Sequence, residues 1–206
     1  MFKRTVWVLS LSVALASCTT TMPDYQRSTL SQRAAIHANV DDTLGKLYLQ
    51  AKGSRELVAK AKGVLVFPSV LTAGFVVGGA YGEGELRVGN AQAGYYKTMT
   101  GSLGFQAGAQ SKALVFLFMT QESLDHFRQG NGWTVGVDAN VALLSIGADG
   151  SVNTETAKAP VVGFVMTNGG LMFNVSLQGT KVSPLDTTAP PSRDATNTPD
   201  SSEHGK

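Results

Sequence analysis

Apolar residues at helical spacing open the part of the chain that can fold. Steps of one, three or four positions separate these residues, which are Ile36, Val40, Leu44, Leu47 and Tyr48. This spacing predicts a helix with one buried face, capped at its start by Ser28 or Ser31 and ended by Gly53. Ser54 should cap a short second helix that stops before Gly63.

Apolar runs of strand length follow the two helices and predict about eight short strands. The run 64–67 is stopped by Pro68, and a glycine-rich run follows it at 74–80. Segments 85–88 and 95–99 flank a Gly-Asn pair, which predicts a hairpin. Further strands are expected at 103–109 and 113–119.

The second half of the chain adds one helix and three more strand segments. Thr120 is placed to cap a helix over 121–128, which Gly130 ends. Residues 133–143 alternate between apolar and polar, which predicts a strand with one wet face. Segments 161–166 and 171–177 flank Asn168-Gly169, another hairpin signal.

The order of these elements indicates the fold class. The strands follow one another in meanders and lack the regular helical crossovers that a parallel sheet needs. Glycines recur inside them, as at Gly78, Gly79, Gly104, Gly108 and Gly136, which is typical of bulges and sharply curled sheets. We therefore expect an α+β fold. Its N-terminal helices should pack on a glycine-rich, mainly antiparallel sheet, curled or barrel-like, with one short inserted helix.

The first residues have the pattern of an export signal. Lys3 and Arg4 precede an apolar run over 6–16, which is too short to span a bilayer as a mature helix. Small residues then lead to Cys18, and Leu15-Ala16-Ser17-Cys18 resembles the lipobox of bacterial lipoproteins. That resemblance implies a diacylglyceryl group on the Cys18 thiol, cleavage of the signal before Cys18, and acylation of the new amine with a palmitate-type chain. An ordinary secretory signal with a chance cysteine is the alternative.

This pattern divides the chain into four parts. Residues 1–17 are the expected signal peptide, 18–30 the lipidated cysteine with its tether, and 31–185 the folded domain. Residues 186–206 have almost no apolar side chains, so we expect a disordered tail. Thr19 follows the cysteine where an Asp would signal inner-membrane retention. By resemblance to lipoprotein sorting in Gram-negative cells, we expect an outer-membrane location facing the periplasm.

The net charge of the chain argues against one class of partner, nucleic acids. The chain has 17 basic and 15 acidic side chains. Because Lys3 and Arg4 lie in the export signal, the remainder is formally neutral. Nucleic-acid binders normally carry a clear basic excess, so we expect no nucleic-acid partner.

Several segments, in the same order along the chain, resemble the SYLF domain family, also called Ysc84-like. The resemblance covers about 35–185 and rests on the segments 61–68, 73–79, 101–110, 133–139 and 179–182. It implies binding of phosphoinositides or other anionic lipids, because eukaryotic members are described in those terms. Some members also bind actin, which a bacterial envelope does not offer, so no actin partner is expected. The family's lipid contact is associated with its basic N-terminal end, and 27–62 is the matching stretch here.

That stretch has a clear basic excess in an otherwise neutral protein. The candidate lipid-binding residues within it are Lys46, Lys52, Arg55, Lys60 and Lys62. A basic face beside apolar residues can lie on an anionic lipid surface, where each cation contributes about 1 kcal/mol. A solvated helix face with no ligand is the alternative, as most charge runs are.

Signals for catalysis are weak, and we expect no enzymatic activity, cofactor or metal. His37 and His126 lie in predicted helices without metal-ligand spacing around them, and each is read as a surface or packed residue. Segment 78–84 lacks the Lys-Ser/Thr of a phosphate loop, and a tight turn or bulge explains it better. Glu83 and Glu85 are interpreted as a solvated strand edge.

Three functions therefore remain open from the sequence. The first is a non-enzymatic lipid-binding module held at the outer membrane. The second is an envelope scaffold that binds a protein partner through a sheet edge or the polar face of its sheet. The third, an enzyme with an unrecognised site, has no motif in its favour.

Overall fold

A computed structural model describes residues 24–74, 77–89, 91–103, 108–130, 132–144, 158–167, 170–171 and 176–185. Its helices are α1 (Asp24–Gln50), α2 (Ser54–Lys60) and α3 (Gln121–Gln129). Its strands are β1 (Gly63–Gly74), β2 (Val77–Val88), β3 (Ala91–Leu103), β4 (Gly108–Phe118), β5 (Trp133–Thr134), β6 (Ala142–Leu143), β7 (Val161–Thr167), β8 (Gly170–Leu171) and β9 (Lys181–Pro184). Cys18 and the tail 186–206 lie outside the described residues.

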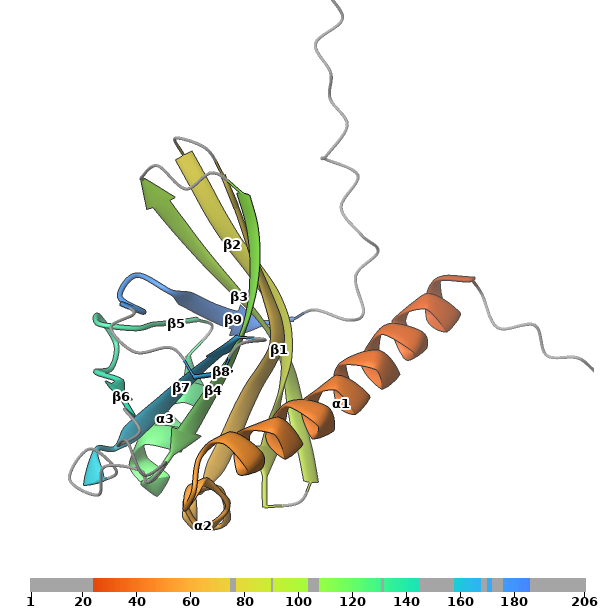
Figure 1. The fold of residues 1–206 in the computed structure, drawn as a ribbon. Helices are drawn as coiled ribbons and strands as arrows, with labels where there is room; N and C mark the ends of the chain where they lie inside the picture. Colours follow the sequence, from red (N-terminus) through yellow and green to blue (C-terminus); the bar gives the residue numbers. More distant parts are fainter. Residues whose placement is uncertain are drawn as a thin grey trace, which may run out of the picture.

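The described strands form one curled sheet in the order β5-β9-β3-β2-β1-β4-β7-β6, with β8 paired to β7. Every pairing is antiparallel except that of β6 with β7. The sheet bends into a half-barrel, and α1 crosses its outer face (Figure 1). The α+β fold with a curled, mainly antiparallel sheet is thus confirmed.

Both faces of the central strands are buried. Val64 and Val66 of β1 pack with Val40 and Leu47 of α1 in the core on the outer face. The residues between them turn to the inner core, which α3 closes. Members of this inner core include Leu65, Phe67, Phe116, Phe118, Leu124, Phe127 and Trp133. The continuous apolar run that the sequence shows at 64–67 therefore serves two cores at once.

Aromatic side chains fix the inner core. The rings of Phe127 and Trp133 meet edge to face at 5.6 Å, and those of Phe116 and Trp133 meet in the same way at 5.8 Å. Thr120 accepts a hydrogen bond from the Ser123 amide and so caps α3, as its sequence predicts. The capped helix thereby holds Phe127 against Trp133.

A bulge in β1 corrects the expected end of that strand. Pro68 does not stop β1, which continues to Gly74 while its pairing with both neighbours shifts register between Val66 and Val70. A proline has no amide hydrogen to donate, and a bulge is where a strand tolerates it. Gly82 and Gly84 face this bulge across β2, and a Cβ on Gly82 would lie 2.7 Å from the Ser69 carbonyl oxygen.

Other boundaries differ from the sequence predictions at turns. The runs 74–80 and 103–109 are not single strands, because β1 ends at Gly74 and β3 ends at Leu103. The predicted strand 133–143 is only β5 and β6, joined by a segment in which Val137 is 80% exposed. Both predicted hairpins are present where the chain is described, between β2 and β3 and between β7 and β8.

The N-terminal helices also depart from their predicted ends. α1 begins at Asp24, so Ser28 and Ser31 lie inside it and do not cap it. Gly53, with φ of 87°, occupies the cap position of α2. Ser54 is instead buried and donates its hydroxyl to the Ala51 carbonyl at 2.7 Å. The serine thus ties the two helices together rather than capping the second.

The bulge predicts a steric requirement for glycine in β2. A Cβ added at Gly84 would collide with the Val66 carbonyl oxygen, which is backbone and cannot move aside. We expect Gly84→Ala to lower the free energy of unfolding by at least about 2 kcal/mol, as overpacking of a closed site does. Gly101→Ala is the matched control, since its Cβ would meet nothing within 4 Å. Urea unfolding measures both, and equal midpoints would contradict the steric argument.

Candidate functional site

A buried polar cluster joins α1 to the outer face of β2. Glu85 has no exposed surface, although it is a carboxylate in the middle of a sheet. Arg87 Nε donates to Glu85 Oε1 at 2.7 Å, and His37 Nδ1 lies 3.0 Å from Glu85 Oε2. Arg87 Nη1 also donates to Asp41 Oδ1 at 2.6 Å. The reading of Glu85 as a solvated edge residue is therefore wrong.

The periods of the two elements explain why these side chains meet. Glu83, Glu85 and Arg87 alternate along β2 and share one face of the sheet. His37 and Asp41 are one helical turn apart on α1. Gln32, further toward the start of the helix, donates to Glu83 at 2.7 Å. Each of the three residues on this face of β2 therefore contacts a side chain of α1.

Arg87 is the cation on which the cluster depends. The Arg87 hydrogen bond holds the pKa of Asp41 below its usual 3.8, against a smaller opposing effect of burial. Burial alone would lower the pKa of Arg87, but its bonds to Asp41 and Glu85 raise it above the usual value. Among the described residues, no group of three His, Cys, Asp or Glu side chains is arranged to hold a metal ion.

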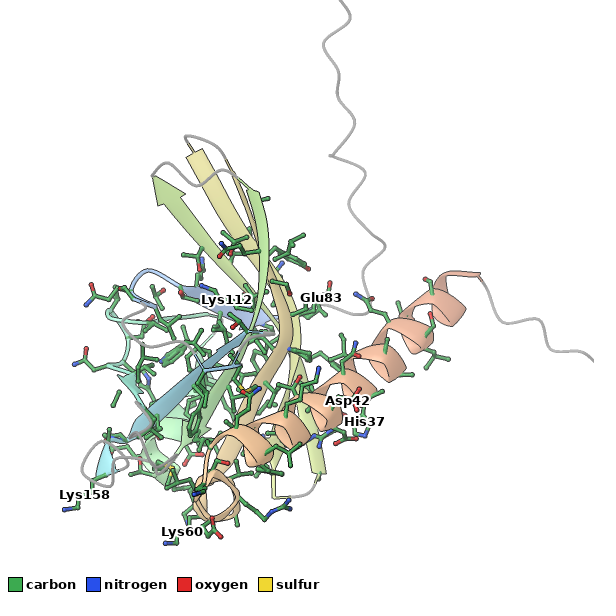
Figure 2. The ribbon with its side chains drawn as sticks, in the orientation of Figure 1. His37, Asp42, Lys60, Glu83, Lys112 and Lys158 are labelled. Carbon is green, nitrogen blue, oxygen red and sulfur yellow. The ribbon has the colours of Figure 1, made fainter. Side chains whose placement is uncertain are left out.

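The candidate lipid-binding residues lie at a different place, the corner where α1 ends and α2 follows. We call this surface the basic corner and define it by Lys46, Lys52, Arg55, Lys60 and Lys62, all of which are exposed. Figure 2 shows Lys60 at the end of the molecule away from the free ends of β1–β4. The guanidinium of Arg55 lies over the Tyr48 ring at 4.3 Å, which orders its side chain.

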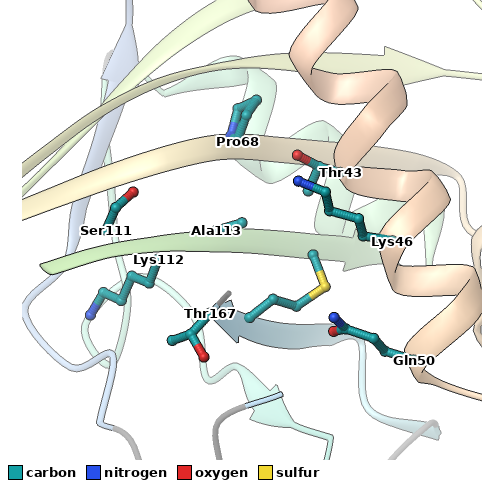
Figure 3. Close-up of a pocket in the computed structure, with 9 residues that line it drawn as sticks. Thr43, Lys46, Gln50, Pro68, Ser111, Lys112, Ala113 and Thr167 are labelled. Atoms are coloured by element: carbon teal, nitrogen blue, oxygen red, sulfur yellow. The ribbon is translucent and has the colours of Figure 1, made fainter. Parts of the chain in front are cut away.

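One member of the basic corner also lines a small pocket beneath α1. Lys46 shares it with Thr43 and Gln50 of the helix and with Lys112 of β4 (Figure 3). Burial lowers the pKa of Lys112. The pocket holds about 60 Å³, room for a water or two rather than a phospholipid headgroup. Its two amino groups also point to different sides, so we assign no ligand to it (Figure 3).

The fold defines the class of protein: an α+β half-barrel domain with its first helix packed across the outer face of the sheet. Residues 99–188 match the family model described as Ysc84, Las17-binding protein actin regulator, which agrees with the resemblance to the SYLF domain family. The match starts in β3, so segments 61–68 and 73–79 of the resemblance lie before it. No curated protein matches the chain. Within the described residues, no helix is long and apolar enough to cross a membrane.

The polar cluster predicts a large loss of stability when its central cation is removed. Arg87→Met leaves Glu85 buried without its closest partner, which we expect to cost about 3 kcal/mol of unfolding free energy. Adding Glu85→Gln to that variant should recover part of the loss, because the uncompensated charge disappears. Asp42→Asn, on the exposed side of the same helix, is the control. Chemical unfolding of the three variants tests this, and a strictly additive double variant would contradict the coupling.

The lowered pKa of Asp41 gives this contact a pH dependence. A carboxyl whose pKa is lower when folded contributes stability above its unfolded pKa, near 3.8, and loses it as pH falls through the folded value. The Asp41 side chain is 57% exposed, so solvent screening limits the effect to under about 1 kcal/mol. Asp41→Asn should thus reduce stability at neutral pH but not near pH 2, as followed by thermal unfolding at both pH values.

Proposed function

We propose that this protein is a non-enzymatic lipid-binding module of the bacterial envelope. Cys18 carries its acyl anchor in the outer membrane, with the domain in the periplasm. The basic corner contacts anionic phospholipid headgroups, and the half-barrel supports it rigidly. The observation that carries the proposal is the exposure of all five cationic side chains at one junction of two helices. The match of residues 99–188 to the Ysc84 family model supports a lipid-binding or scaffold role in general.

Electrostatics favours a membrane surface as the ligand of the basic corner. Each cation near an anionic bilayer contributes about 1 kcal/mol, so a few of them give useful affinity without a shaped pocket. The acyl anchor would add to this by keeping the domain at high local concentration beside the bilayer. A broad exposed surface suits such a ligand, whereas a soluble small molecule needs a concave site.

A scaffold role is the alternative. Two observations argue against the sheet edge and the polar sheet face as its binding surfaces. The outer strands of the described sheet, β5 and β6, are two residues each, and short edge strands offer little backbone for another chain to pair with. The expected polar strand face at 134–140 is a turn region rather than a continuous strand. A protein partner would therefore need another surface.

Charge reversal tests the proposal. We expect Lys52→Glu, Arg55→Glu and Lys60→Glu together to lower affinity for anionic vesicles about 100-fold or more, since three attractions become repulsions. The assay is co-sedimentation of the mature chain with Cys18→Ser, using vesicles with and without phosphatidylglycerol at low and high salt. Reversal of Lys158, Arg193 and Lys206 is the control, because it changes the net charge equally outside the basic corner. Equal binding by both triple variants would contradict the proposal.

A further inference from the structure

Toward their free ends, β1, β2 and β3 carry exposed apolar side chains in one continuous row. Leu71 pairs with Tyr81 across β1 and β2, and Tyr81 pairs with Met99 across β2 and β3. The three are 52%, 44% and 53% exposed, respectively. Because directly paired residues share a face of the sheet, they form a single stripe. We call this stripe, with the strand ends beyond it, the apolar end.

The next row toward the strand ends adds no polar side chain. Ala73 pairs with Gly79, and Gly79 pairs with Gly101 on the same face. No charged residue occurs between Lys62 and Glu83, or between Lys97 and Lys112. The parts of these strands that project beyond the rest of the sheet in Figure 1 therefore contain no charged residue. Such a surface can leave water without the cost of burying an ion.

A cation borders the apolar end at its base. Lys181 of β9 pairs directly with Met99 and therefore lies on the same face of the sheet. The carboxylate of Glu83 is occupied, since it accepts hydrogen bonds from Gln32 at 2.7 Å and from the Tyr81 hydroxyl at 2.8 Å. Burial and this bond raise the pKa of Tyr81 to about 12, so the ring stays neutral. Apolar side chains bordered by an ammonium group complement the acyl chains and phosphates of an anionic bilayer.

The position of the expected anchor points to the same ligand. Residues 19–23 between Cys18 and α1 can span at most about 18 Å. The first turns of α1 lie beside the apolar end, where Gln32 bonds Glu83. The 27 residues of α1 extend about 40 Å, and the basic corner lies at the far end. The apolar end is therefore closer to the anchored terminus than the basic corner is.

We propose that the apolar end docks on an anionic lipid bilayer. Leu71, Tyr81 and Met99 reach the boundary of the acyl chains, while Lys181 contacts phosphates. This inference rests on the proposed function in taking lipid as the ligand, but it assigns a second surface that the basic corner does not share. Binding through it depends on apolar burial and so resists salt, unlike binding through the basic corner.

A fluorescent probe on the stripe tests this contact. Cys18→Ser leaves the mature chain without cysteine, so Met99→Cys can carry a single environment-sensitive label. We expect a blue shift with phosphatidylglycerol-containing vesicles that persists at high salt, and none with a label at Lys60→Cys. Leu71→Asp should lower vesicle affinity about tenfold, because a half-exposed leucine would otherwise be buried. Val137→Asp is the matched control, since Val137 is 80% exposed elsewhere.

The outcomes separate the two lipid surfaces. No shift at position 99, with sedimentation that still depends on the basic corner, would overturn this inference and leave the proposed function intact. A salt-resistant shift abolished by Leu71→Asp but not by reversal of the basic corner would support it. A shift that grows with protein concentration without vesicles would assign the stripe to a second copy of the chain and overturn lipid docking. Circular dichroism of each variant confirms that the fold is retained.

Discussion

The burial of Glu85 is the constraint on which the outer half of the structure depends. A carboxylate with no exposed surface must be matched by a cation or by hydrogen bonds. Arg87 supplies the cation from β2, and His37 Nδ1 of α1 lies 3.0 Å from Glu85 Oε2. Arg87 in turn bonds Asp41, so the helix can sit at only one register along the strand without leaving a buried charge unpaired. The apolar contacts of Val40 and Leu47 supply most of the attraction, whereas the polar cluster fixes where the helix lies. Such specificity is a recognised use of buried ion pairs.

As the polar cluster fixes the position of α1, the bulge around Pro68 fixes the shape of the sheet. It shifts the register of β1 against both neighbours, and glycines at 82 and 84 leave room for the displaced backbone. Bulges increase local twist and bend the strand that carries them. Below the bulge, β1 is covered by α1 on one side and by the aromatic core on the other. Beyond it, α1 no longer covers the outer face, which leaves Leu71 and its neighbours exposed.

The sequence predicts the elements whose signals are local. Thr120 with its helix, the two hairpins and the inward stripe of α1 all follow from spacing and turn residues. Prediction from the sequence fails where a residue's burial or the end of a strand depends on contacts with residues distant along the chain. Glu85 is hidden by a helix almost fifty positions away, and Pro68 survives inside β1 because glycines stand opposite it. The alternation of Glu83, Glu85 and Arg87, facing a His-x-x-x-Asp turn, was the readable signal of the polar cluster. The exposed basic corner was predicted as a set of residues, but its distance from the apolar end depends on how the helix is laid across the sheet.

That distance limits how lipid can be engaged. A helix of 27 residues separates the start of α1 from the basic corner by about 40 Å, so a bilayer engages both surfaces at once only when the molecule lies along it. In an upright orientation, the two surfaces serve two bilayers. An acyl anchor at Cys18, as proposed, would favour the upright orientation, because a tether of at most about 18 Å would keep the start of α1 near the anchoring membrane. The apolar end then settles on the anchoring membrane, and the basic corner faces outward toward whatever anionic surface comes within reach.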